Sequence, residues 1–189
     1  MDKKGHWEQV YSAKAPDAVS WYIPHLETSL SLIRQAVSNQ NATIIDVGGG
    51  EATLVDDLIA EGYEDISVLD ISQKAIDVAK ERLGKLAGKA HWYCADITQA
   101  SLPKNYFDVW HDRAVFHFLT QEDDRQAYVE QVMRSVKHGG YVIMSTFGPE
   151  GPEKCSGLDV VRYDAETLYH QFGRSFKMMN TFTEIHKTP

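Results

Sequence analysis

The sequence has little cysteine. Cys94 and Cys155 are the only two cysteines among 189 residues, and they lie far apart. They form neither a Cys-x-x-Cys pair nor a Cys/His spacing typical of a metal site. We therefore expect reduced thiols in a reducing compartment and no bound metal.

Long apolar runs and an excess of positive charge are missing as well. No run approaches the roughly 18 apolar residues of a membrane-spanning helix, and the start, Met1 to His6, lacks the apolar core of a signal peptide. We expect a cytoplasmic protein with no membrane partner. The 19 Lys and Arg residues are outnumbered by 27 Asp and Glu residues, giving a net charge of −8. This balance argues against nucleic acid as a partner, because its phosphates must be neutralised by basic side chains.

The length and composition are those of one globular domain. A chain of 189 residues with 43 % hydrophobic residues is long enough for a sizeable core and short for two domains. We expect residues 1–189 to form a single domain. The oligomeric state is left open.

The stretch from Thr43 to Ala52 combines an apolar run, an acid and a glycine-rich turn. It predicts a strand, a tight turn and a helix start that together can hold a ligand, because glycine lets the backbone turn sharply and approach the ligand. A dinucleotide would bring its pyrophosphate next to Asp46, and its fingerprint requires a third glycine where Thr53 stands. A nucleoside cofactor with an amino-acid tail and no phosphate fits better. An NAD-dependent oxidoreductase is a less favoured alternative.

This acidic-x-Gly-x-Gly pattern resembles the nucleotide-binding motif of class I S-adenosylmethionine-dependent methyltransferases. The resemblance implies that S-adenosyl-L-methionine is the cofactor, S-adenosyl-L-homocysteine its product, and that Asp46, Gly48, Gly49 and Gly50 contact it. It also implies an α/β fold, a Rossmann-like doubly wound and mostly parallel sheet with strand order 3-2-1-4-5-(7)-6. The seventh strand, antiparallel in the family, is not supplied by the residues up to Pro189.

Two further apolar runs, over 66–70 and 90–97, predict strands that reach an acid at their ends, Asp70 and Asp96. The carboxyl ends of parallel strands meet at one edge of an open sheet, where ligands bind. Asp70 is placed to accept both ribose hydroxyls, a feature that NAD-binding proteins share. In the family, the acid at the position of Asp96 receives the adenine amino group, and we add the following Ile71 and Ile97 as cofactor contacts.

The first 25 residues are rich in aromatic side chains. Trp7, Val10 and Tyr11 share one face of a predicted helix. The aromatics either pack on the core or form a lid over the cofactor, where aromatic faces stabilise a sulfonium cation. The pattern Trp-x-x-x-Tyr followed by Ser-Trp-Tyr resembles a methyltransferase branch that includes protein-lysine methyltransferases acting on an elongation factor and on citrate synthase. That resemblance implies cofactor contacts from Trp7, Tyr11 and Trp21.

The predicted fourth strand, over 107–113, ends in a dense polar cluster that includes His111 and Asp112. In the family this exit lies beside the transferable methyl group. We predict that His111 contacts the cofactor and that His111 or Asp112 acts as a general base, since a neighbouring His and carboxylate can remove a proton. The alternative is an ion pair that holds the turn. The lysine methyltransferases carry an acid-Lys-Gly-Thr run here, and the departure at residues 112–115 argues against a lysine acceptor.

The remaining patterns complete the predicted order of elements. Helices are expected over 26–37, 52–61 and 75–83, from a capping box at Thr120 and Asp123 to Gly139-Gly140, and from Asp164 to Phe172, with strands over 141–147 and 176–186.

The sequence thus predicts a transferase that moves the methyl group of S-adenosylmethionine by in-line displacement to a small-molecule acceptor. A protein-lysine methyltransferase and a non-catalytic partner subunit that binds the cofactor are the alternatives.

Overall fold

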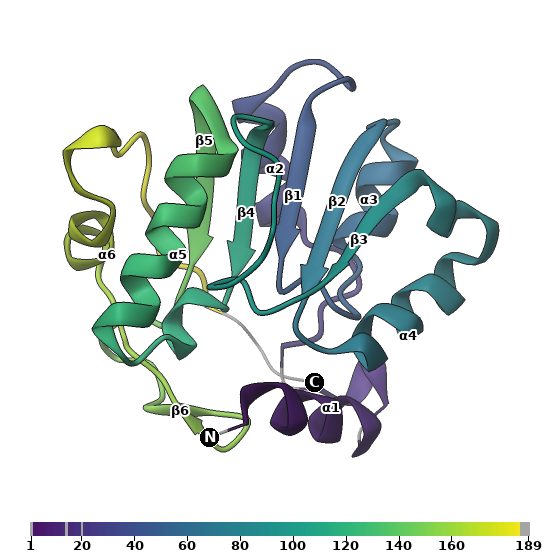
Figure 1. The fold of residues 1–189 in the computed structure, drawn as a ribbon, viewed down its shortest axis with the longest axis horizontal. Helices are drawn as coiled ribbons and strands as arrows, with labels where there is room; N and C mark the ends of the chain where they lie inside the picture. The colour runs from purple at the N-terminus through teal and green to yellow at the C-terminus, as the bar shows by residue number, and fades with distance from the viewer. Residues whose placement is uncertain (1, 14, 20, 186–189) are drawn as a thin grey trace.

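The fold is a five-stranded parallel sheet covered by helices on both faces (Figure 1). The structure, a computed structural model, describes residues 2–13, 15–19 and 21–185. The strand order is β3-β2-β1-β4-β5, and every neighbouring pair is parallel. The strands are β1 (Thr43–Val47), β2 (Asp65–Asp70), β3 (Ala90–Cys94), β4 (Phe107–Arg113) and β5 (Val136–Ser145). The predicted Rossmann-like class and the order of the first five strands are confirmed.

Helices on the two faces of the sheet bury two separate apolar clusters. The helices are α1 (Lys3–Ala13), α2 (Glu27–Ala36), α3 (Leu54–Ala60), α4 (Gln73–Leu83), α5 (Glu122–Ser135) and α6 (Ala165–Phe172). Because successive strand residues point to opposite faces, Ile44 packs with α2 and α3, whereas Ile45 packs with α5 and α6. All five residues of β1 are buried, as expected for a central strand covered on both sides.

The predicted helices lie within two residues of the observed bounds, except at the end of α5. Ser72 caps α4 by accepting a hydrogen bond from Ala75 N, and Asp164 caps α6. The predicted capping box at Thr120 is wrong: α5 starts after Gln121, which makes no side-chain cap. The helix also ends at Ser135, so that Gly139-Gly140 lie within β5. Gly139, with φ of 81°, accompanies a shift in the pairing of β4 with β5, and the glycine pair therefore marks a strand irregularity.

The predicted sixth strand is wrong over its described part. Residues 176–185 are irregular, and residue 186 lies outside the described residues. In the family's order an antiparallel strand separates strands five and six, and no described residue pairs with β5 on that side. The segment is instead held by side chains, including Thr28 Oγ1 donating to Glu184 Oε1 at 3.1 Å. Two short strands, β6 (Lys154–Cys155) and β7 (Leu158–Asp159), form a hairpin outside the main sheet.

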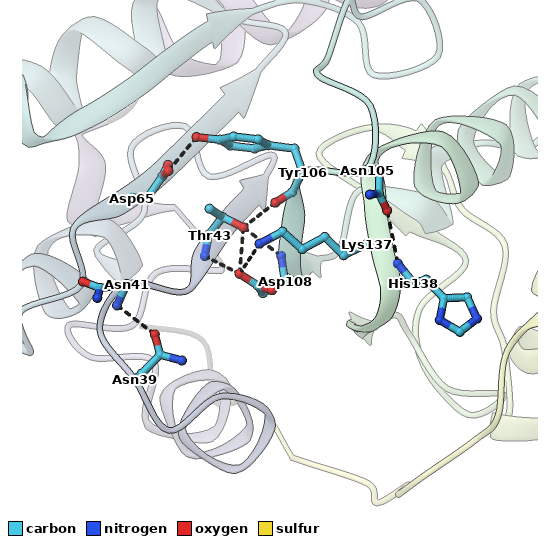
Figure 2. A network of polar contacts seen from close by, with 9 residues as sticks. All are labelled: Asn39, Asn41, Thr43, Asp65, Asn105, Tyr106, Asp108, Lys137 and His138. Atoms are coloured by element: carbon cyan, nitrogen blue, oxygen red, sulfur yellow. Dashed lines mark hydrogen bonds and ion pairs between the residues drawn. The ribbon is translucent and has the colours of Figure 1, made fainter.

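The amino edge of the sheet is tied together by a polar network (Figure 2). The Asp108 carboxylate accepts from Thr43 N at 2.8 Å, from Thr43 Oγ1 at 2.9 Å and from Lys137 Nζ at 2.8 Å. Tyr106 donates its hydroxyl to Asp65. These contacts join β1, β2, β4 and β5 at the edge opposite the glycine turn. The polar groups that make them therefore stabilise the sheet and lie away from the candidate ligand site.

Helix α1 lies across the carboxyl ends of the strands, below the arrowheads in Figure 1. It is fixed there by Glu8, whose carboxylate accepts from Ser72 Oγ at 3.0 Å, Gln73 N at 2.8 Å and Lys74 N at 3.2 Å. An acid at a helix start both satisfies unpaired N–H groups and interacts favourably with the helix dipole. α1 therefore supplies a cap for α4 from a distant part of the chain. No helix in the described part of the chain is long and apolar enough to cross a membrane.

Replacing Glu8 by Ala is expected to loosen α1. Loss of a helix cap costs about 0.5–2 kcal/mol, so amide exchange in residues 3–13 should become several-fold faster, as measured by hydrogen–deuterium exchange. Gln9→Ala, at an exposed neighbour on the same helix, is the control and should leave exchange unchanged. Equal exchange in both variants would show that Glu8 does not hold the helix.

Candidate functional site

The turn after β1 has no room for side chains. Gly48 and Gly50 have φ of 72° and 30°, in the region that favours glycine. A Cβ on Gly48 would collide with Val115 Cγ2, and one on Gly50 would lie 2.6 Å from Asp70 Oδ2. The turn therefore packs directly against the residues that follow β4 and against the tip of β2.

Two buried carboxyl groups flank this turn, Asp70 at the end of β2 and Glu51 directly after Gly50. Each side chain is 4 % exposed. Asp70 Oδ1 accepts from Ser72 N at 2.8 Å, whereas neither oxygen of Glu51 has a hydrogen-bond partner among the described residues. Burial raises the pKa of each group to about 7, assisted for Asp70 by the neighbouring acids. Glu51 was not predicted as a site residue from the sequence. Its position immediately after the glycine turn could have indicated it.

An aromatic cluster brings the N-terminal segment over these acids. The Trp7 ring lies 5.8 Å from Tyr11, 6.0 Å from Trp21 and 5.1 Å from Phe118, measured between centroids. Burial, followed by the nearby Asp70 and Glu51, raises the pKa of Tyr11 well above its usual value. The three aromatics predicted to act together are thus neighbours. Phe118, from the 3-10 turn Phe116–Phe118, was missed.

His111 is a buried bridge between Asp46 and helix α2. Its Nδ1 lies 2.7 Å from Asp46 Oδ1 and its Nε2 lies 2.9 Å from Ser29 Oγ. The His111 residue is 1 % exposed and Asp46 is 3 % exposed. A general base needs a ring nitrogen that faces the acceptor, and both nitrogens are occupied here. The geometry favours the ion-pair alternative, in which His111 positions Asp46 under the glycine turn.

Asp112 shapes the exit of β4. Its carboxylate accepts from Val115 N at 2.7 Å, Phe116 N at 3.1 Å and the Tyr128 hydroxyl at 2.5 Å. Burial raises its pKa to about 6. The intervening Ala114 has φ of 73°, a conformation that non-glycine residues rarely adopt and that surrounding contacts must hold. This geometry favours a structural role for Asp112 over the base role predicted from the sequence.

The predicted adenine contacts lie at the far end of the same edge. β3 ends at Cys94, so Asp96 stands in the loop beyond it, where its Oδ1 accepts from Thr98 N at 2.9 Å. Ile71 is half-buried beside the tip of β2. Ile97 is 4 % exposed and belongs to the core under α5. The Ile97 side chain is therefore committed to packing, and contact with a ligand is left to its backbone.

The exit of β4 carries two more polar groups, His117 and Arg113. His117 is fully buried, its Nδ1 accepts from Phe147 N at 3.4 Å, and its Nε2 has no partner in the described part of the chain. Burial lowers the pKa of His117 to about 4, so the ring is neutral, and acceptance at Nδ1 places its proton on Nε2. Arg113 Nη1 donates to Trp21 O at 3.0 Å. Within residues 2–13, 15–19 and 21–185, no group of three or more His, Cys, Asp or Glu side chains is arranged to hold a metal ion.

The two buried carboxyl groups predict an unusual pH dependence of stability. Between pH about 4 and 7 the folded protein retains protons that the unfolded chain has released, so the stability of the ligand-free protein falls as pH rises through this range. Asp70→Asn and Glu51→Gln should therefore raise the melting temperature at pH 8 by several degrees, about 2–4 °C per kcal/mol, with a smaller gain at pH 5. Glu64→Gln, at an exposed acid, should change neither value. Lower melting temperatures of both variants at both pH values would contradict the idea that ionising these buried acids destabilises the ligand-free fold.

The chain is similar to known methyltransferases. The chain is 28 % identical over 138 residues to the eEF1A lysine and N-terminal methyltransferase of Mus musculus. That match covers 73 % of this chain but only 19 % of the relative's length.

Solved structures share the fold at low sequence identity. A TehB-like S-adenosylmethionine-dependent methyltransferase from Corynebacterium glutamicum is 18 % identical with a TM-score of 0.61, covering 90 % of this chain and 79 % of the other. An N-methyltransferase from Haemonchus contortus, in complex with phosphomonomethylethanolamine and S-adenosylhomocysteine, is 16 % identical with a TM-score of 0.65, covering 91 % and 40 %.

A family model described as a methyltransferase domain matches residues 44–140, just over half of the 189 residues. The match begins in β1, includes the glycine turn and the tips of β2 and β3, and ends within β5. The chain therefore belongs to the family described as a methyltransferase domain.

Proposed function

We propose that this enzyme transfers the methyl group of S-adenosylmethionine to a small neutral or anionic molecule rather than to a lysine side chain. The observation that carries this proposal is the chemistry at the exit of β4, where Asp112 and His111 are already occupied by other groups and Arg113, with Glu184 nearby, brings a guanidinium. The oxidoreductase alternative is set aside by the family to which the chain belongs.

The donor half of the proposed site fits the cofactor. Asp70 stands at the strand tip where a ribose diol binds, and burial without a full set of partners suits it to accept hydroxyl protons. Asp96 is the proposed acceptor for the adenine amino group. The glycine turn admits the methionine part, and the aromatic cluster of α1 and its neighbours offers faces to the sulfonium.

The acceptor half differs from what a lysine requires. A lysine ammonium must lose a proton before it attacks, so an acid or a base close to it is expected. Asp112 is filled by three donors, His111 is occupied at both nitrogens, and neutral His117 carries its proton on Nε2. Arg113, whose pKa is lowered by burial, adds a guanidinium. These groups favour an acceptor that brings oxygen or another lone pair, and no ammonium.

The proposed reaction then needs little proton transfer. The acceptor's lone pair attacks the methyl carbon while the carbon–sulfur bond breaks, and S-adenosylhomocysteine leaves with the electron pair on sulfur. Alignment of donor and acceptor can supply up to about 7–11 kcal/mol of the barrier reduction. An acceptor that is already anionic requires no general base from the protein, whereas a neutral hydroxyl or thiol must release its proton to water.

The mouse relative supports one alternative, a protein amine as the methyl acceptor. Its printed description names lysine and N-terminal amines as methyl acceptors. Because the chain spans less than a fifth of that relative, and because Asp112-Arg113-Ala114-Val115 departs from the acid-Lys-Gly-Thr run, we rank a protein amine second.

Radiolabelled methyl transfer to a panel of acceptors tests the proposal. We expect label on small carboxylates, phenolates or thiols and none on purified elongation factor 1A or lysine peptides. For an anionic acceptor, Arg113→Met should raise KM about 10-fold or more by removing a charge-assisted contact, while S-adenosylhomocysteine binding is retained.

Arg174→Met, at an exposed arginine, is the matched control and should leave KM unchanged. Transfer to lysine with an efficiency equal to or above that of every small acceptor would overturn the proposed acceptor class.

A further inference from the structure

We propose that Glu51 binds the α-ammonium group of the cofactor's methionine part, so that the donor site selects ligands with a cationic amino-acid tail. This inference rests on the proposed placement of the cofactor at the glycine turn. It does not depend on which molecule accepts the methyl group.

The first argument is that the Glu51 carboxylate is buried with no hydrogen-bonded cation among the described residues, and that the nearby Arg82 only partly opposes the rise in its pKa caused by burial. It is 4 % exposed, and neither oxygen has a hydrogen-bond partner among the residues that the structure describes. An ionised carboxylate taken out of water costs several kcal/mol unless a cation or several donors compensate it. A fold that retains such a group beside its ligand-binding turn therefore leaves the compensation to a ligand.

The nearest basic residue provides only part of that compensation. Arg82 donates from Nη1 to the main-chain oxygen of Glu51 at 2.7 Å and from Nη2 to the main-chain oxygen of Ala52 at 2.8 Å. It also forms a two-pronged ion pair with Asp56, at 3.0 Å and 2.7 Å. Its donors are thus used to hold the backbone of the turn in place. The Glu51 carboxylate keeps its capacity to accept hydrogen bonds.

The neighbours of Glu51 indicate which part of the cofactor it meets. Asp70 lies next to Gly50, the residue that precedes Glu51. Its Oδ2 is 2.6 Å from the position that a Cβ on Gly50 would take. Both acids act electrostatically on Tyr11, which covers them from α1. Asp70 is already assigned to the ribose hydroxyls. A second acid one turn of backbone away, next to the glycines that admit the amino-acid tail, suits the three N–H donors of an ammonium group.

Three ligands separate the possible roles of Glu51 in calorimetric binding measurements. S-adenosylmethionine carries both a sulfonium and an ammonium, S-adenosylhomocysteine carries the ammonium alone, and 5′-methylthioadenosine carries neither but keeps the ribose and adenine. We expect Glu51→Gln to weaken binding of the first two by a similar factor, about 10- to 100-fold, and to leave 5′-methylthioadenosine within about two-fold. Asp70→Asn should weaken all three, and Glu64→Gln should weaken none.

Each other pattern overturns the inference in a different way. Weakening of S-adenosylmethionine alone would assign Glu51 to the sulfonium. Weakening of all three ligands would assign it to the ribose or to the shape of the turn. Unchanged binding of all three would leave the carboxylate with no role in the donor site. Failure of the unmodified protein to bind any of the three would instead refute the placement of the cofactor, and this result is independent of the acceptor panel.

Discussion

The tight glycine turn between β1 and α3 is the constraint on which the rest of the site depends. The positions of Gly48 and Gly50 leave no space for a Cβ, because Val115 and Asp70 already occupy it. A ligand can approach the backbone only because these side chains are missing. Asp46 lies directly beneath the turn and is held by His111, so the turn rests on a fixed polar support.

The acids around this turn lower the stability of the ligand-free protein. Asp70 and Glu51 are buried beside each other with raised pKa values, so the ligand-free fold carries unfavourable electrostatic energy at neutral pH. In the proposed placement of the cofactor, its ribose hydroxyls and ammonium group would relieve this energy and so add to its affinity. Helix α1 is part of the same region. Glu8 attaches it to the start of α4, and Tyr11 lies close enough to Asp70 and Glu51 for both acids to raise its pKa.

The sequence predicted the parts of the molecule that local patterns determine. Buried parallel strands are continuous apolar runs, so β1 and β4 were recognisable, and Asp164 indicated a helix start because its side chain can cap the first turn. Contacts between residues far apart in the chain could not be predicted. The cap of α4 is completed by Glu8 from α1, and the partners of His111 and Asp112 come from other elements. The spacing of residues along the chain does not show that these polar groups already have hydrogen-bond partners. Nor does it show that the Glu51 carboxylate has none among the described residues.

The charge distribution at the site gives the two halves different chemistry. Acids gather at the tips of β1 and β2 and behind α1, whereas the exit of β4 presents Arg113 and a neutral His117. A sulfonium donor placed between them has its ammonium and ribose hydroxyls on the acidic side and its methyl group towards the basic side. An anionic or lone-pair acceptor is attracted to that basic side, and the product S-adenosylhomocysteine has lost the sulfonium charge that the aromatic cluster favours. In the proposed placement, the loss of the sulfonium charge weakens the contact with the aromatic cluster and thereby favours release of the product.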